Sequence, residues 1–378
     1  MTTVTEPEVR AALARVIDPE IGRPITELGM VKSIAIDGSS VQVEIYLTIA
    51  GCPMKSTLTE NSRAAVAEVD GVTDVTVTTD VMSDEQRREL RTSLRGNATE
   101  VVNPFAQPGC TTRIYAVASG KGGVGKSSMT VNLAVALAAR GLSVGVLDAD
   151  IYGHSIPHML GSDERPHQVD DMIMPPMAHG VKMISIGHFV EGNSPVVWRG
   201  PMLHRAITQF LTDVFWGDLD VLLLDLPPGT GDVAISVAQL VPNAELLIVT
   251  TPQAAAAEVA ERAGSISQQT RQRIAGVIEN MGAMVMPDGS TVDVFGAGGG
   301  QTVADRLSIL TGTEIDLLGE VPLDPALRAG GDVGVPVVIA HPESPTSAAI
   351  GEIADKIVVR RESLAGKSLN LGVADKTR

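Results

Sequence analysis

Cysteine is scarce in this sequence, since the 378 residues include only Cys52 and Cys110. So few thiols exclude a scaffold built on disulfides, and they exclude a four-cysteine metal site within one chain. The low cysteine content fits a reducing compartment. No charged-then-apolar segment opens the chain, and no apolar run approaches the length that spans a bilayer. We therefore expect a soluble, cytoplasmic protein without a membrane partner.

Basic residues are also in short supply. The chain has 29 Lys and Arg against 45 Asp and Glu, which gives a net charge of −16. This acidity argues against a general nucleic-acid surface, so we expect no nucleic-acid partner. Hydrophobic residues make up 44% of the chain, which is enough for sizeable cores, and the length fits two domains.

The order of apolar segments predicts where the domains lie. Residues 1–84 combine helical spacing with a hairpin signal at Asp37-Gly38, which predicts a small α+β domain. Residues 85–112 begin with a charged, helix-compatible stretch and continue with turn formers, so we assign them to a linker. In residues 113–360 strands alternate with helices, the pattern of an α/β fold with a doubly wound, mostly parallel sheet. The polar residues 361–378 are expected to form a mobile tail.

A phosphate-binding loop is the most specific motif in the large domain. Residues 120–127 read G-K-G-G-V-G-K-S, and they lie between an apolar strand and a helix, as that motif requires. Glycines let backbone N–H groups approach phosphate oxygens, and the helix presents its positive end to the same anion. Lys126 is expected to reach the β- and γ-phosphates and Ser127 to ligate Mg²⁺. The residues that we assign to ATP here are Gly120, Lys121, Gly122, Gly123, Val124, Gly125, Lys126, Ser127 and Ser128.

Acidic residues end two of the apolar strands. Asp148 and Asp150 follow residues 143–147, and Asp225 follows residues 221–224. Ligands of such sheets bind at the carboxyl ends of the strands, so these carboxylates should face the phosphates. An apolar strand that ends in aspartate is the Walker B arrangement, in which the carboxylate reaches Mg²⁺. The simpler alternatives are strand-end acids in a turn for the first pair and a helix cap for Asp225.

The motif K-G-G-V-G-K-S resembles the deviant Walker A motif of the family that includes MinD and the nitrogenase iron protein. That resemblance implies that Lys121 reaches across a homodimer interface to the partner's nucleotide, and we treat it as catalytic with Lys126 and Asp150. It implies that Asp150 positions the attacking water and that Asp148 orders the Mg²⁺ shell. Further matches follow at residues 279–281 and 319–324, and the resemblance implies that Asn280, Pro322 and Asp324 contact the base. Residues 198–202 are typical of the Mrp/ApbC branch and receive no chemical role.

A second resemblance covers the small domain. The segments at residues 16–21 and 27–31, followed by Gly51-Cys52-Pro53, are similar to the domain of iron–sulfur assembly factors. In that family the cysteine near the helix start matters for iron–sulfur work. A thiol at a helix N-terminus has a lowered pKa and is a better nucleophile or metal ligand. Cys52 is therefore a candidate iron–sulfur residue, and the alternative is a small buried residue at the start of a helix.

The resemblance fails at one point. Mrp/ApbC proteins usually carry Cys-x-x-Cys shortly after Glu-Asn-Met, and two subunits then supply four thiolates to a bridging cluster. Here Met286 and Gly289 occupy those two positions. A thioether is a poor substitute for a thiolate on iron, and glycine has no side chain. A cluster held there in the usual way is excluded.

The sequence thus predicts an ATPase of the Mrp/ApbC type that requires Mg²⁺ and acts as a homodimer. Its expected cargo is an iron–sulfur cluster or precursor, delivered to apo-protein clients or assembly factors. A nucleotide-switched scaffold or partitioning factor without metal cargo is the alternative, and the missing Cys-x-x-Cys favours it. A kinase-like phosphotransferase shares the loop, but Lys121 and the segment Pro227-Pro228-Gly229-Thr230-Gly231-Asp232 argue against it.

Overall fold

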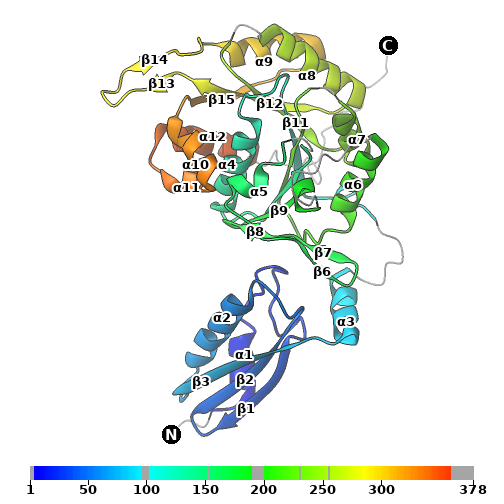
Figure 1. Cartoon of the computed structure of the whole chain (residues 1–378), viewed down its shortest axis with the longest axis vertical. Coiled ribbons are helices and arrows are strands. Elements are labelled where there is room, and N and C mark those ends of the chain that lie inside the picture. The colour runs from blue at the N-terminus through cyan, green and yellow to red at the C-terminus, as the bar shows by residue number, and fades with distance from the viewer. Residues whose placement is uncertain are drawn as a thin grey trace, which may run out of the picture.

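The computed structural model describes residues 4–95, 102–150, 153–189, 200–229, 231–253 and 256–358. A small N-terminal domain with a three-stranded sheet lies at one end of the molecule, and a larger domain with an eight-stranded sheet lies at the other (Figure 1). The expected tail, at 361–378, lies outside the described residues. No helix in the described part of the chain is both long and apolar enough to cross a membrane.

The N-terminal domain packs its helices against one small sheet. Its elements are α1 (Glu6–Leu13), β1 (Val31–Asp37), β2 (Ser40–Leu47), α2 (Lys55–Ala67), β3 (Asp74–Val81) and α3 (Asp84–Arg95). Strand β2 pairs antiparallel with β1 and parallel with β3. Gly38 has a φ of +61° in the β1–β2 turn, which glycine tolerates without steric cost. Strand β3 begins at Asp74, three residues after Gly71, and runs to Val81.

Helix α3 is the charged segment that the sequence placed at the start of the linker. Leu90 of α3 is buried in the same hydrophobic cluster as Leu13 of α1, Ile45 of β2 and Leu58 of α2. Arg88 and Glu89 of α3 are exposed, and Arg91 pairs with Asp171 of the large domain. The helix therefore packs on the N-terminal core, although its composition is strongly polar.

The large domain is built on a sheet with strand order β15-β12-β11-β4-β10-β5-β9-β8. All neighbouring strands are parallel except β8 and β9. The strands are β4 (Arg113–Ala118), β5 (Val144–Asp148), β8 (Met177–Ala178), β9 (Val181–Ser185), β10 (Val221–Asp225), β11 (Glu245–Thr250), β12 (Ile274–Gly282) and β15 (Leu317–Pro322). This architecture confirms the predicted doubly wound α/β class.

Helices and short hairpins complete the large domain. The helices are α4 (Lys126–Ala138), α5 (Ile156–Met159), α6 (Gly200–Thr212), α7 (Asp232–Leu240), α8 (Ala256–Thr270), α9 (Gly299–Thr311), α10 (Pro325–Val333), α11 (Val337–Ala340) and α12 (Pro345–Val358). The 3₁₀ turns are η1 (Pro104–Ala106) and η2 (Ile186–Phe189). Two small hairpins pair β6 (His167–Val169) with β7 (Met172–Met174), and β13 (Met284–Val285) with β14 (Thr291–Val292).

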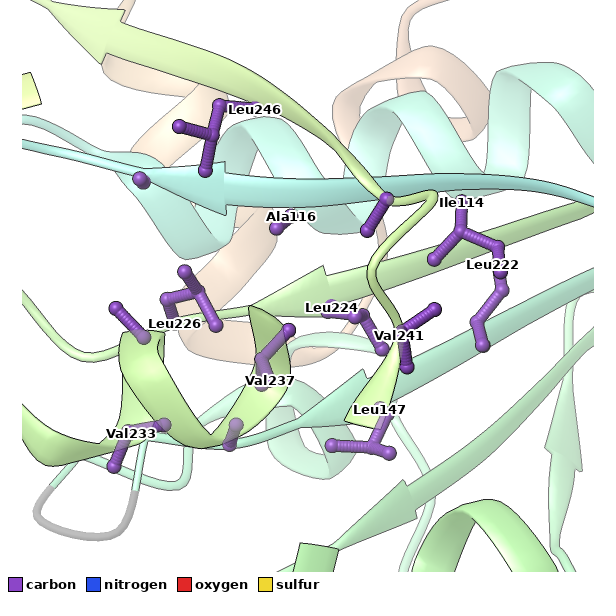
Figure 2. Close-up of a cluster of buried hydrophobic side chains, with 14 of the residues drawn as sticks. Ile114, Ala116, Leu147, Leu222, Leu224, Leu226, Val233, Val237, Val241 and Leu246 are labelled. Carbon is purple, nitrogen blue, oxygen red and sulfur yellow. The ribbon is translucent and has the colours of Figure 1, made fainter. Parts of the chain in front are cut away.

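The sheet is buried on both faces, which is why its strands read as continuous apolar runs. On one face Ile114 and Leu224 pack with Val233 and Val237 of α7 (Figure 2). On the other face the alternate strand residues, Val117 among them, pack with α4 and α12. Every residue of β10 is buried. The parallel register places Asp225 at the end of β10 directly beside Asp148 at the end of β5.

Candidate functional site

Two glycines of the loop between β4 and α4, Gly120 and Gly125, could not be replaced by another residue without strain. Gly125 caps α4 with a φ of +80°, and a Cβ there would lie 2.2 Å from the Asn280 Nδ2 atom. A Cβ on Gly120 would lie 2.8 Å from the Val259 Cα atom. The 13-residue helix α4 then starts at Lys126 and points its N-terminus at the loop. Helix and loop together form a site for an anion.

Lys126 lies inside this site and contacts the end of β10. It is 6% exposed, and its Nζ donates to the Asp225 Oδ2 atom at 2.7 Å. The Ser127 hydroxyl donates to the same oxygen at 2.6 Å, and the Thr130 hydroxyl donates to Asp225 Oδ1 at 2.7 Å. Sequence reasoning missed Thr130. Its position four residues after Lys126, on the same face of α4, is the signal that could have indicated it.

Asp148 lies beside Asp225 and is completely buried. It accepts hydrogen bonds from the Ser185 hydroxyl at 3.0 Å and from the Asp150 N–H at 3.1 Å. Burial, followed by the charge of Asp225, raises the pKa of Asp148 above its ordinary value. The structure thus brings Ser127, Asp148 and Asp225 together. These are oxygen donors of the kind Mg²⁺ prefers, so the residues fit the expected ion. Ser185 was not predicted, because β9 is distant in the sequence.

Two of the expected catalytic residues lie at the edge of the site. Asp150 is half-buried, and its Oδ1 accepts from the Gly153 N–H at 3.1 Å. Lys121 is also half-buried, and its Nζ donates to the Gln253 Oε1 atom at 2.6 Å. Gln253 follows β11 and was missed by the sequence reasoning. The contact holds Lys121 within its own chain.

The residues expected at the base have different surroundings. Asn280 is buried, and its Nδ2 donates to the Val124 carbonyl at 2.9 Å, so it contacts the phosphate loop directly. Its Oδ1 is buried without a hydrogen-bond partner in the described part of the chain, which leaves one acceptor for a ligand. Asp324 caps α10 through the Ala326 N–H and accepts from Thr346, so both of its oxygens are engaged. Pro322 ends β15 beside Gly282 of β12.

Cys52 does not have the electrostatic environment that its place before α2 suggested. The thiol is 7% exposed, and its Sγ lies 4.0 Å from the Glu20 Oε2 atom. Burial, followed by the negative charge of Glu20, raises the pKa of Cys52 to about 11. The expectation of a lowered pKa is therefore wrong for the conformation described. Desolvation and a nearby carboxylate outweigh the helix N-terminus.

Glu20 is itself buried, and this predicts a measurable pH effect. Burial, followed by the charges of Asp18 and Glu164, raises the pKa of Glu20 from 4.5 to about 7. Between these values the unfolded chain has lost a proton that the folded protein keeps, so stability falls as pH rises through this window and is level above it. Glu20→Gln should raise the free energy of unfolding by about 1–3 kcal/mol at pH 8 and have little effect near pH 4.5.

Urea unfolding of wild type and Glu20→Gln at the two pH values measures this difference. The matched control is Glu27→Gln, because Glu27 is exposed in the same domain. An equal effect of Glu20→Gln at both pH values would show that burial does not hold the proton on this carboxyl.

The hairpin β13–β14 occupies the place where a cluster was excluded. Met286 donates its N–H to the Ser290 carbonyl and accepts from the Gly289 N–H, so both residues form the turn. Gly289 has a φ of +81°. Nowhere in the described ranges do three or more His, Cys, Asp or Glu side chains gather in a way that could hold a metal ion. Residues 198–199 and Thr230 of the predicted motifs lie outside the described residues.

The sheet, the glycine loop ahead of α4 and the Lys126–Asp225 contact define a P-loop NTPase. A family model described as NUBPL iron-transfer P-loop NTPase matches residues 111–358, and one described as iron-sulfur cluster assembly protein matches residues 6–79. The chain belongs to this family of iron-transfer P-loop NTPases, which confirms the resemblance inferred from the sequence.

Individual relatives agree with this membership. A Mycobacterium tuberculosis protein named iron-sulfur cluster carrier protein is 67% identical over 365 residues, with 96% of each chain covered. A protein of the same name from Synechocystis is 40% identical and covers 94% of this chain and 97% of its own length. Among solved structures, a nucleotide-binding protein from Archaeoglobus fulgidus in complex with ADP is 34% identical, with a TM-score of 0.52. It covers 67% of this chain and 91% of its own.

Proposed function

We propose that this chain binds ATP and Mg²⁺ at residues 119–128, hydrolyses the nucleotide as a homodimer, and carries an iron–sulfur cluster or precursor to apo-protein clients. The observation that supports the ATPase most directly is the buried contact of Lys126 and Ser127 with Asp225. It joins the phosphate loop to the strand-end carboxylate that P-loop enzymes use for Mg²⁺.

Within this proposal, the backbone N–H groups of the loop and the N-terminus of α4 bind the phosphates. Lys126 would exchange its contact with Asp225 for the terminal phosphate. Asp225, Ser127 and Asp148 would then hold Mg²⁺, which neutralises negative charge on the phosphates when bound. Asp150 would orient the attacking water. Asn280 would couple the base to the loop, because its amide already contacts Val124, and Pro322 and Asp324 would border the base.

Lys121 provides the test of the homodimer. Lys121→Ala should reduce ATP turnover at least about 100-fold, as loss of one transition-state donor does, while the fold stays intact. Mixing this variant with Lys126→Ala should restore part of the activity. In a mixed dimer, the site with an intact Lys126 receives Lys121 from the other protomer. Turnover is measured by phosphate release over a range of mixing ratios. If mixing restores nothing, Lys121 does not act across an interface.

The cargo proposal is supported by the family match of the N-terminal domain and by the names of the relatives. Anaerobic reconstitution with iron and sulfide should load the wild-type chain. Cys52→Ala should lose most of the bound iron, and Cys110→Ala, the matched control, should retain it. Iron and sulfide content and the visible spectrum measure the result. If the wild type takes up no cluster under anaerobic conditions, the proposed carrier role is wrong.

A nucleotide-switched scaffold or partitioning factor is the second candidate. The observation that favours it is the β13–β14 turn, where Met286 and Gly289 provide no thiolate. A colourless protein that dimerises when ATP is added would support the scaffold. A brown protein with stoichiometric iron would support the carrier. The carrier and the scaffold share the same nucleotide site, so ATP turnover does not distinguish them. The visible spectrum and the iron content do.

A further inference from the structure

The β6–β7 hairpin of the large domain packs against the N-terminal domain (Figure 1). Val169, Met172 and Met174 of this hairpin are buried, and they belong to the same hydrophobic cluster as Cys52 and Leu58. The thiol proposed to carry cargo is therefore buried in a cluster that both domains build. Separation of the hairpin from the N-terminal domain would open this cluster to solvent.

Polar groups also lie in this contact between the β6–β7 hairpin and the N-terminal domain, which we call the seam. They are close to the Cys52 thiol. The Glu20 Oε2 atom lies 4.0 Å from the Cys52 Sγ and 3.7 Å from the Nε2 atom of His167, the first residue of β6. That Nε2 is buried and has no hydrogen-bond partner in the described part of the chain. Burial lowers the pKa of His167, so its ring is neutral near pH 7 and forms no ion pair with Glu20. Buried polar groups that are incompletely paired weaken an interface.

Two ion pairs lie at the rim of the seam, and one of them is exposed while the other is partly buried. Arg91 of α3 donates to Asp171 at 2.9 Å, with the two side chains 39% and 58% exposed. Arg87 of the same helix lies 4.0 Å from Asp170. Exposed pairs contribute little to stability, and domains of one chain commonly move relative to each other. The contacts therefore allow the hairpin to separate from the N-terminal domain.

The hairpin is also connected to the nucleotide site. From Asp148 at the end of β5, the chain continues through α5 and the loop at residues 160–166 to β6. A second connection is β9, where Ser185 donates to Asp148 and the Lys182 Nζ, near Asp18 and Glu20, donates to the Trp216 carbonyl. A rearrangement of the segment after Asp148 would thus act on the elements that form the seam.

We propose that the β6–β7 hairpin is a nucleotide-responsive cover over the Cys52 thiol. The cover is closed in the conformation described, and rearrangement of the segment after Asp148 around ATP would withdraw it. This inference rests on the proposed ATP site. It assigns the hairpin a role in controlling when the N-terminal domain can receive or release its cargo.

The test measures how fast iodoacetamide alkylates Cys52, by mass spectrometry, in a Cys110→Ser background that leaves one thiol. Asp171→Arg and Arg91→Asp each replace attraction with repulsion across the seam and should each raise the rate about fivefold. The double variant restores the pair with reversed charges and should return the rate to that of the background. Asp163→Arg is the matched control, since Asp163 is an exposed acid on the loop that precedes β6.

The second part of the experiment measures the effect of a bound nucleotide on the alkylation rate of Cys52. A non-hydrolysable ATP analogue with Mg²⁺ should raise the alkylation rate in the background protein and leave it unchanged in Lys126→Ala. Unchanged rates in both single charge reversals would overturn the cover. Nucleotide binding is measured on the same samples, and binding without any change in rate would overturn the nucleotide response. If the analogue does not bind, the proposed ATP site is wrong. If only cluster uptake fails, the cargo role is wrong and the proposed cover over Cys52 is unaffected.

Discussion

Replacement of Lys126 by alanine is expected to reduce ATP turnover at least about 100-fold, because it removes the charged donor that would contact the terminal phosphate. The same change should lower the free energy of unfolding by about 3–5 kcal/mol, the usual cost of removing one partner of a buried ion pair. Asp225 is completely buried and lies beside Asp148, and within the described residues Lys126 is the cation that pairs with it. Phosphate release, binding of a fluorescent ATP analogue and urea unfolding measure the two effects.

A double variant separates these effects. Lys126→Ala with Asp225→Asn removes the uncompensated charge, so much of the lost stability should return while turnover stays absent. Lys55→Ala is the surface control, since Lys55 is exposed on α2. Wild-type turnover by a folded Lys126→Ala protein would show that the nucleotide is bound elsewhere.

Asp150→Asn should retain ATP binding and lose hydrolysis by about 10²–10⁴-fold, the range that a positioned acid–base group contributes. The amide oxygen can still accept from the Gly153 N–H, so the loop conformation should be preserved. An amide cannot accept a proton from the attacking water as a carboxylate can. Binding by fluorescence and single-turnover hydrolysis separate the two steps.

Asp163→Asn is the matched control for this change, because Asp163 is an exposed acid that follows α5. If Asp150→Asn hydrolyses ATP at the wild-type rate, Asp150 has no part in activating water. If it loses binding together with hydrolysis, Asp150 supports the nucleotide site and is not specific to the chemical step.

The fold class and the phosphate loop could be predicted because both depend on residues that are close together along the chain. Strand β10 is apolar throughout and ends in Asp225, and the glycines around Lys126 lie at fixed spacing in the loop. Contacts between distant segments could not be predicted in this way. Lys126 and Asp225 are 99 positions apart, and Lys121 and Gln253 are 132 positions apart.

Cys52 in the N-terminal domain shows most clearly what could not be predicted from the sequence. Its place before α2 predicted a lowered pKa, because the helix N-terminus is a local feature. Burial depends instead on which segments fold over the thiol. Here the shared cluster and Glu20 raise the pKa of Cys52, which is opposite to the predicted direction. No spacing in the sequence indicated that His167 would lie next to Glu20.

The sequence by itself determined the family, the loop that receives phosphates, and the loss of two thiols at Met286 and Gly289, because these are matters of residue identity and order. Only the tertiary structure decided the proton affinity of Asp148, the partner of Lys121 and the burial of Cys52. Each of these depends on desolvation and on distances across the fold, which the linear order of residues does not specify.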